Sequence, residues 1–299
     1  MEATAYSEMH QSVLLEETVQ MLRVQPGKLY VDGTFGLGGH TSRILKDSAP
    51  DGRVIAFEWD ERAIELGSTR IAEERERVTI IRKNFAELDA GLAEAGIEVV
   101  DGIMADIGMS SLQIDHGQRG FSFKKDEPLD MRMDQRRALT AATLVDSASA
   151  DELADIFYCY GDERQSRRIA NCIVEERRRK RIETTAQLAD IVAQAIPKRF
   201  HPPKIHVATK VFQALRIAVN DELANLASLL DKAADYLVAG GRLCIISFHS
   251  IEDRMVKRKL AASAMLKPIT KKPIMPEQSE IIRNPRARSA RLRVAERLA

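Results

Sequence analysis

Short apolar segments alternate with helical patterns along the first hundred residues. The apolar runs, each bounded by glycine or charged residues, are Leu29–Asp32, Arg53–Glu58, Val78–Arg82 and Gly102–Ile107. The amphipathic stretches that separate them are Thr41–Lys46, Glu61–Glu74 and Phe85–Ala95. Continuous apolar runs joined by crossover helices are typical of parallel strands that are buried on both faces. The sequence therefore predicts an α/β fold with a doubly wound, Rossmann-like sheet.

This alternation stops after Ile107 and resumes only near Leu215. The interval has helical patterns throughout, and Ser149-x-x-Glu152 and Thr184-x-x-Gln187 have the form of helix-capping boxes. A long helix bearing Leu223, Leu226, Leu230 and Leu237 is expected next, ending at Ala239-Gly240-Gly241 before a strand at Arg242–Phe248 and a last strand around Leu292 and Val294. We therefore predict one discontinuous domain, residues 1–114 and 207–299, interrupted by an inserted helical domain at residues 115–206.

Composition and charge narrow the class of protein. Hydrophobic residues make up 44% of the 299, and no apolar run is long enough to cross a bilayer. Nothing near the N-terminus resembles a secretory signal, so a cytoplasmic location with no membrane partner is expected. Three cysteines without C-x-x-C spacing and six histidines without an H-x-x-x-H pair predict neither a disulfide framework nor a metal site.

Nucleic-acid affinity would have to come from local basic clusters, because the net charge is only +1. Arg164 to Arg181 holds eight Arg or Lys against two Glu, and Arg283 to Arg293 holds five Arg and no acid. A solvated helix face explains such runs equally well. Both explanations stay open from sequence alone.

A glycine-rich bend, Asp32-Gly-Thr-Phe-Gly36-Leu-Gly38-Gly39-His40, joins the first predicted strand to a helix. A dinucleotide fingerprint would place its third glycine at position 41, which is threonine. Asp32 suits a cationic amino acid better than a pyrophosphate, and Glu58 lies at the distance in sequence expected of a carboxylate that binds ribose hydroxyls. The bend is thus similar to the first motif of class I methyltransferases, which bind S-adenosylmethionine.

Two further polar side chains follow predicted strands at the same sheet edge. Asp106 ends the fourth strand, where it either faces the cofactor or an amine that loses a proton, or merely caps the next helix. His249 follows the fifth strand, where it either orients the substrate or forms a structural hydrogen bond.

Long motifs along nearly the whole chain resemble those of the bacterial 16S ribosomal RNA cytosine N(4)-methyltransferases, the RsmH or MraW family. The matching segments are His10–Glu17, Asp32–His40, Arg119–Phe123, Leu129–Asp134, Thr209–Asn220, Ile246–Arg254 and Asn284–Ser289. The resemblance implies an S-adenosylmethionine site that includes Gly38, Gly39, His40, Glu58, Phe85, Asp106 and Gln113. The bend itself adds Asp32 and Gly36 to the predicted cofactor residues. Many family members have aspartate where this chain has Glu58.

The resemblance also implies the substrate, a cytidine of 16S rRNA near the P-site in the decoding region of the small ribosomal subunit. Its exocyclic 4-amino group would receive the methyl group, and we expect Asp106 and Ser110 beside the amine as catalytic residues. The helical insertion would recognise the RNA. Further candidate substrate contacts are Phe121 and Phe123, which could sandwich a flipped base or belong to an ordinary core, and Arg132, His249, Arg286 and Arg288.

Transfer to carbon is disfavoured, because no cysteine ends a predicted strand where a nucleophile would be needed. The chain lacks the Asn/Asp-Pro-Pro-aromatic motif of many amino-methyltransferases, so the 4-amino target follows from the resemblance alone. A nicotinamide-dependent oxidoreductase and a non-catalytic RNA-binding assembly factor are the alternatives. The sequence leaves a homodimer open.

Overall fold

The structure is a computed structural model that describes residues 11–109, 118–203 and 205–299. Its chain divides into two compact units, one formed by Met1–Ser110 with Leu223–Ala299 and the other by Ser111–Glu222. Helix α11 (Thr209–Asn220) packs on α8 (Ala150–Gly161) inside the second unit. The boundary between the units therefore lies after the end of α11, whereas the sequence predicted a boundary between residues 206 and 207.

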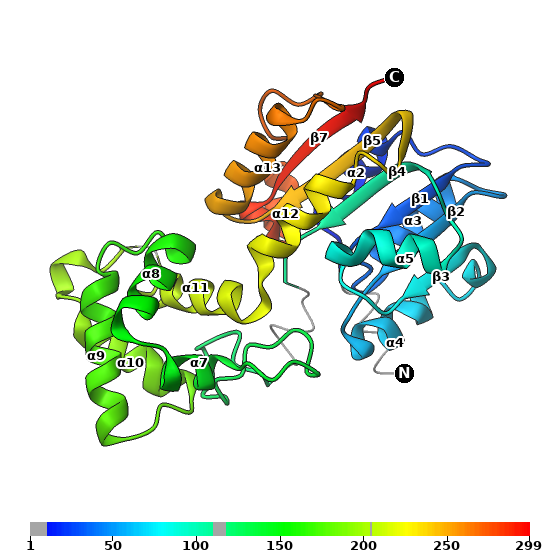
Figure 1. The fold of residues 1–299 in the computed structure, drawn as a ribbon. Helices are drawn as coiled ribbons and strands as arrows, with labels where there is room; N and C mark the ends of the chain where they lie inside the picture. The colour runs from blue at the N-terminus through cyan, green and yellow to red at the C-terminus, as the bar shows by residue number, and fades with distance from the viewer. Residues whose placement is uncertain (1–10, 110–117, 204) are drawn as a thin grey trace. The chain divides into compact units, whose positions relative to one another are not determined.

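The first unit is built on a seven-stranded sheet in the order β3-β2-β1-β4-β5-β7-β6 (Figure 1). Its strands are β1 (Leu29–Asp32), β2 (Arg53–Phe57), β3 (Val78–Ile81), β4 (Val100–Asp106), β5 (Leu237–Ser247), β6 (Leu266–Pro268) and β7 (Arg291–Arg297). The first five strands in this order are parallel, and β7 runs antiparallel between β5 and β6. The strand order reverses direction between β1 and β4, which is where doubly wound sheets bind their ligands. The predicted α/β class is confirmed.

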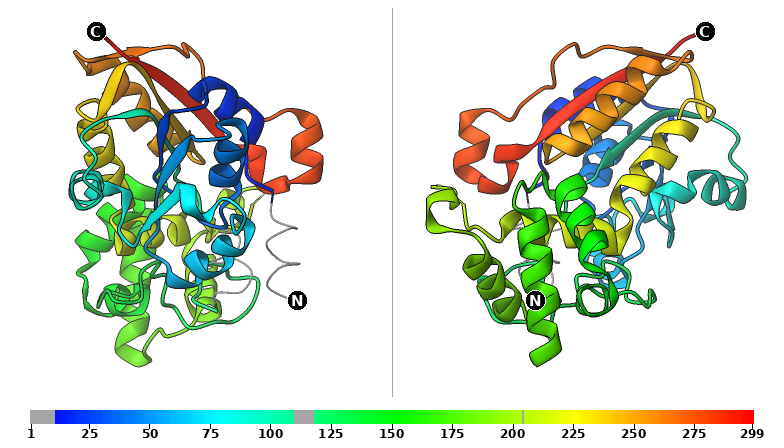
Figure 2. Two further views of the ribbon diagram at one scale, coloured as in Figure 1. Left: turned by 90° about the vertical axis from the view of Figure 1, so that its right-hand side faces the viewer. Right: turned by 60° about the vertical axis from the view of Figure 1, so that its left-hand side comes forward.

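Helices cover both faces of this sheet. They are α2 (Leu15–Leu22), α3 (Gly39–Asp47), α4 (Glu61–Arg70), α5 (Leu88–Glu94), α12 (Glu222–Lys232), α13 (Ser250–Ala262) and α14 (Gln278–Arg283). Successive strand residues point to opposite faces, so Val31 and Ile103 join one core with α5, α12 and α13, while Tyr30 and Met104 join another with α2 and α3. Figure 2 shows α13 lying along β7.

The junction between α12 and β5 differs from the sequence prediction. The helix ends at Lys232, and Leu237 already belongs to β5, where it pairs with Val100. Gly240, at φ +80°, and Gly241 form an irregularity inside the strand rather than a helix stop. A Cβ on Gly241 would lie 3.0 Å from the carbonyl oxygen of Asp101, so the close approach of β4 explains the glycine.

The second unit is helical. Its main helices are α7 (Ala141–Ser147), α8, α9 (Ser166–Arg179), α10 (Thr185–Ala195) and α11, packed around a core that includes Phe157 and Leu188. Both predicted capping boxes are confirmed, because Ser149 accepts from the N–H of Glu152 and Thr184 accepts from the N–H of Gln187. Nowhere in the described ranges does a helix combine the length and the apolar character needed to cross a membrane.

Candidate active site

The bend between β1 and α3 is fixed by hydrogen bonds to neighbouring strands and by close contacts with α4. Gly33 N–H donates to the carbonyl of Met104 (2.8 Å) in β4, and Phe35 N–H donates to the carbonyl of Phe57 (2.9 Å) in β2. Gly38 has φ +74°, and a Cβ there would lie 2.9 Å from the carbonyl oxygen of Gly67 in α4. These contacts require glycine at position 38 for the protein's own packing.

Gly36 differs from its neighbours in the bend. Its φ is +52°, and the nearest atom to a Cβ built on it would be the carbonyl oxygen of Thr34 at 3.8 Å. Gly39, in contrast, lies against the Ser12 side chain, whose Oγ would be 2.0 Å from such a Cβ. Space beside the bend is therefore open at Gly36, where a ligand can approach the backbone without meeting a side chain.

Asp32 is fully buried beneath the bend. One carboxylate oxygen accepts from the backbone N–H of Thr34 (3.0 Å), and the other accepts from the hydroxyl of Thr41 (2.7 Å). Burial raises the pKa of Asp32, and the hydrogen bonds from Thr41 and Thr34 oppose that rise. Asp32 thus ties the strand, the bend and the first turn of α3 together, and Thr41 occupies the position where a dinucleotide binder would need glycine.

Glu58 follows β2 and is half-buried. Its Oε2 accepts from the N–H of Gly36 (2.9 Å), while Oε1 accepts from the N–H groups of Trp59 and Asp60 (both 2.9 Å). Burial raises the pKa of Glu58 to about 7, against the lowering effect of these backbone hydrogen bonds. Oε1 already accepts two N–H groups, whereas Oε2 accepts only one and keeps a lone pair, so Glu58 can still accept from a hydroxyl group of a ligand at Oε2.

Phe85 lies on the other side of the bend, in a single 3₁₀ turn (Phe85–Glu87) after β3 that a capping box between Asn84 and Glu87 holds in place. The ring is half-buried, and its Cβ would lie 3.2 Å from a Cβ built on Gly33. Glycine at position 33 thus lets the bend pass directly beside Phe85. An aromatic face in this position can stack on the flat heterocycle of a nucleoside.

Asp106 ends β4 and meets the bend through Thr34, whose hydroxyl accepts from the N–H of Asp106 (2.7 Å). One carboxylate oxygen accepts from the N–H of Gly108 (3.2 Å). Burial raises the pKa of Asp106 to about 6; electrostatic interaction with His40 opposes the rise, and the charges of Asp32 and Glu252 add to it. A carboxylate with such a pKa is ionised at neutral pH and still basic enough to take a proton.

His40 is buried in the first turn of α3, and its Nε2 lies 3.1 Å from the carbonyl oxygen of Val13. Because a carbonyl can only accept, Nε2 carries the proton and Nδ1 is left as an acceptor. Burial lowers the pKa of His40, opposed by the charge of Asp106. The predicted cofactor residues thus share one edge of the sheet, apart from Gln113, which, like Ser110, lies outside the described residues.

The candidate substrate residues in the helical unit have partners of their own. Phe123 packs against His206 (ring centroids 4.8 Å apart) and Phe212 (4.9 Å), and Arg119 lies over the ring of Phe121. Arg132 forms a bidentate ion pair with Asp130 and also donates to two backbone carbonyls. These contacts are those of structural residues at the edge of a core.

His249, Arg286 and Arg288 belong to the sheet unit. His249 is the N-cap of α13, where its ring accepts from the N–H of Glu252 (3.4 Å). The two arginines are exposed in a 3₁₀ turn at Pro285–Ser289. His249 therefore makes a structural hydrogen bond, one of the two roles that the sequence left open, while the arginines are accessible to a ligand.

The cysteines offer no nucleophile at the sheet edge. Cys244 lies inside β5, fully buried, and burial raises the pKa of its thiol to about 12. Cys159 and Cys172 lie on α8 and α9. The thiol of Cys244 is thus held in its unreactive, protonated form, and the other two cysteines belong to the helical unit.

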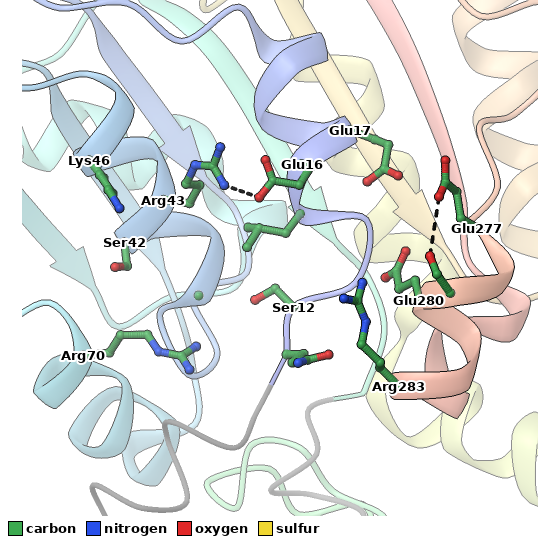
Figure 3. Close-up of a pocket in the computed structure, with 14 residues that line it drawn as sticks. Ser12, Glu16, Glu17, Ser42, Arg43, Lys46, Arg70, Glu277, Glu280 and Arg283 are labelled. Atoms are coloured by element: carbon green, nitrogen blue, oxygen red, sulfur yellow. Dashed lines mark hydrogen bonds and ion pairs between the residues drawn. The ribbon is translucent and has the colours of Figure 1, made fainter.

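A separate pocket of about 710 Å³ lies between α2, α3 and α14 (Figure 3). Its charged lining consists of Glu16, Glu17, Glu277, Glu280, Arg43, Lys46, Arg70 and Arg283. Arg43 points toward Glu16 and pairs with it, and Glu280 accepts from the N–H of Leu14 (2.9 Å). Acids and bases are balanced here, and among the predicted cofactor residues that the structure describes, Gly39 alone lines the pocket.

One prediction concerns the contact of α4 with the bend. A Cβ on Gly67 would lie 2.6 Å from the ring of Phe35 and 2.7 Å from the carbonyl oxygen of Gly36. We expect Gly67→Ala to destabilise the protein by about 1–3 kcal/mol and to displace the bend. Thermal unfolding checks this, with the exposed Glu65→Ala on the same helix as control. Equal melting temperatures for the two variants would contradict the packing described here.

Comparison with known proteins places this geometry in a family. The family model of the MraW methylases matches residues 7–298. The chain is 60% identical over 289 residues to the ribosomal RNA small subunit methyltransferase H of Desulfotalea psychrophila, covering 97% of this chain and 98% of that one. It is 51% identical over 290 residues to the protein of the same name from Cyanothece sp., covering 97% and 95%.

Solved structures align more loosely. Aeropyrum pernix fibrillarin in complex with S-adenosyl-L-methionine gives a TM-score of 0.44 at 11% identity, with 94% of this chain and 73% of that chain covered. The assignment of this chain to a family and a fold rests on the family match and on the strand order. The chain belongs to the MraW methylase family, and its fold is that of the class I S-adenosylmethionine-dependent methyltransferases.

Proposed function

We propose that this protein transfers a methyl group from S-adenosylmethionine to the exocyclic 4-amino group of a cytidine in 16S rRNA, near the P-site in the decoding region of the small ribosomal subunit. The observation that carries the proposal is the convergence of Glu58, Asp106 and the open backbone at Gly36 on one sheet edge. The names of the relatives support an rRNA substrate in the small subunit. The nitrogen target rests on the motif resemblance.

The residues of the site fit a nucleoside that carries a cationic amino acid. Glu58 would accept from the ribose hydroxyls, and the half-buried Phe85 would lie beside the adenine. Gly36 would let the ligand approach the bend, with Gly38, Gly39, Asp32 and His40 fixing the shape of the bend. Gln113 completes the proposed set. S-adenosylmethionine would supply an activated methyl group on a sulfonium.

The chemistry requires an N–C bond to form as the S–C bond breaks, and the amine then loses one proton. Asp106 is the proposed acceptor of that proton, with Ser110 beside it. The pKa of about 6 keeps the carboxylate ionised at neutral pH. Positioning of the amine in line with the departing sulfur would supply most of the acceleration, about 7–11 kcal/mol for well-oriented reactants.

No cysteine is needed for this reaction, in contrast to methylation at carbon 5 of the base, which requires a thiolate. The exposed Arg286 and Arg288 would bind phosphates of the substrate, and Phe121, Phe123, Arg132 and His249 would contribute by holding the surrounding structure in place. A protein that modifies the small subunit would work in the cytoplasm.

The proposal is tested by incubating small ribosomal subunits from a strain that lacks this enzyme with the protein and isotopically labelled S-adenosylmethionine. Mass spectrometry of nuclease fragments then locates the label. One labelled methyl on the 4-amino group of a single cytidine is expected. Label at carbon 5 or on another base would refute the nitrogen target, and an unlabelled rRNA would favour a non-catalytic assembly factor.

A further inference from the structure

Six arginines of the basic cluster at Arg164–Arg181 fall into two groups in the structure. Arg177 donates to the carbonyls of Val145 and Ala148 (both 2.6 Å), and Arg179 pairs with Glu176 (2.8 Å). Arg181 lies 3.5 Å from Asp146. These three side chains are engaged in holding the helical unit together or in local ion pairs.

Three other arginines of the cluster are arranged differently. Arg164, Arg167 and Arg168 line a pocket of about 550 Å³ at the junction of α8 and α9 (helices labelled in Figure 1). In the described parts of the chain, no carboxylate lies within ion-pairing distance of any of the three. The remaining lining residues are Ala154, Asp155, Tyr158, Gln165 and Ser166. Three arginines against one aspartate make the pocket cationic.

Tyr158 gives this pocket a second property. It follows Asp155 by three residues on α8, so both side chains face the same side of that helix, and 62% of the Tyr158 surface is exposed. The ring is therefore accessible to a ligand that enters the pocket. An exposed ring beside unpaired guanidinium groups is the combination that binds a nucleotide, because the ring stacks on the base and arginine binds the phosphate.

We propose that this pocket, lined by Tyr158, Arg164, Arg167 and Arg168, binds an unpaired nucleotide of the RNA substrate, with its base stacked on Tyr158. The inference rests on the proposed rRNA substrate and adds a contact outside the methyl-transfer site. The pocket volume suits one nucleotide. An acidic peptide would satisfy the arginines but would leave the tyrosine ring without a partner, so RNA is the occupant that accounts for both features.

The first test measures stacking. The full-length protein is titrated into fluorescein-labelled decauridylate, and binding is followed by fluorescence anisotropy. Tyr158→Ala is expected to weaken binding about 5- to 150-fold, the range for loss of one stacked base, while Tyr158→Phe keeps it. The same oligomer with abasic riboses should bind more weakly and should not distinguish Tyr158→Ala from wild type. Unchanged binding by Tyr158→Ala overturns the proposal.

The second test separates the pocket from diffuse charge. Arg168→Ala is compared with Arg178→Ala, which removes the same charge from an exposed position on α9 outside the pocket. Arg168→Ala should weaken binding more than Arg178→Ala does. It should also make the negative slope of log affinity against log salt shallower by about 0.7, the value for one single-strand phosphate contact. Equal losses for the two variants overturn the proposal, and displacement of the RNA by polyglutamate at equal charge concentration indicates an acidic protein partner instead.

Further measurements distinguish a failure of the proposed function from a failure of the pocket proposal. Methyl transfer to the small subunit and calorimetric binding of S-adenosylmethionine are measured on the same variants. Tyr158→Ala should bind the cofactor normally and methylate with a raised KM and an unchanged kcat. If the wild type transfers no methyl group, the proposed function fails, whereas the oligonucleotide measurements still decide whether the pocket binds RNA.

Discussion

Asp106→Asn should lower methyl transfer to the small subunit about 10²- to 10⁴-fold, the usual contribution of a positioned acid or base. The substitution keeps the size of the side chain and an oxygen that can accept from the N–H of Gly108. The backbone N–H that donates to Thr34 is also untouched. Only the charge and the basicity are lost, so a loss of kcat is expected at saturating S-adenosylmethionine, and calorimetry measures any change in cofactor affinity separately.

The matched control for this variant is Asp101→Asn, at the opposite end of the same strand, where the carboxylate accepts from the N–H of Leu29. It should methylate at nearly the wild-type rate. The pH profile adds a second readout, because the ionised carboxylate is the active form and its pKa is about 6. Wild-type activity should rise with pH through about 6, and Asp106→Asn should lose that rise. Near-normal turnover by Asp106→Asn would remove this residue from the mechanism.

The sheet could be predicted from sequence because its parallel strands are buried on both faces. Residues such as Val31 and Ile103 belong to one core and their neighbours to the other, so the strand segments have no polar face to interrupt the apolar run. The sequence also predicted which candidate site residues lie close together, because the carboxyl ends of parallel strands share one edge of the sheet. Glu58 and Asp106 could be placed there without coordinates.

Features that depend on contacts distant in sequence could not be predicted in the same way. Ala239-Gly240-Gly241 has the local signature of a helix stop, and only the pairing of β5 with β4 shows that it lies inside a strand. Phe123 could have been a base-stacking residue, but Phe212, far along the chain, packs against its ring. The roles of Thr34 and Thr41 likewise appear only once hydrogen-bond partners are known.

Glu58 carries the second large expected effect. Glu58→Ala should weaken S-adenosylmethionine binding by about 10- to 150-fold for each ribose hydroxyl that loses a charged partner. The truncation also leaves the N–H groups of Gly36, Trp59 and Asp60 without their acceptor, so part of the loss would come from a less ordered bend. Isothermal titration calorimetry measures the affinity. Glu58→Asp keeps the negative charge, and it should recover most of the binding.

A ligand analogue that lacks both ribose hydroxyls separates recognition of the ribose from support of the bend. Removing the hydroxyls should weaken binding to the wild type but hardly affect Glu58→Ala, because the partner is already absent in that variant. The pH dependence provides an independent check, since hydroxyls donate to the ionised carboxylate and the pKa of Glu58 is about 7. Wild-type affinity for S-adenosylmethionine should therefore fall as pH drops below about 7, by at most about tenfold per unit for one proton. If the analogue lost equal affinity for both proteins, Glu58 would support the bend without contacting the ribose.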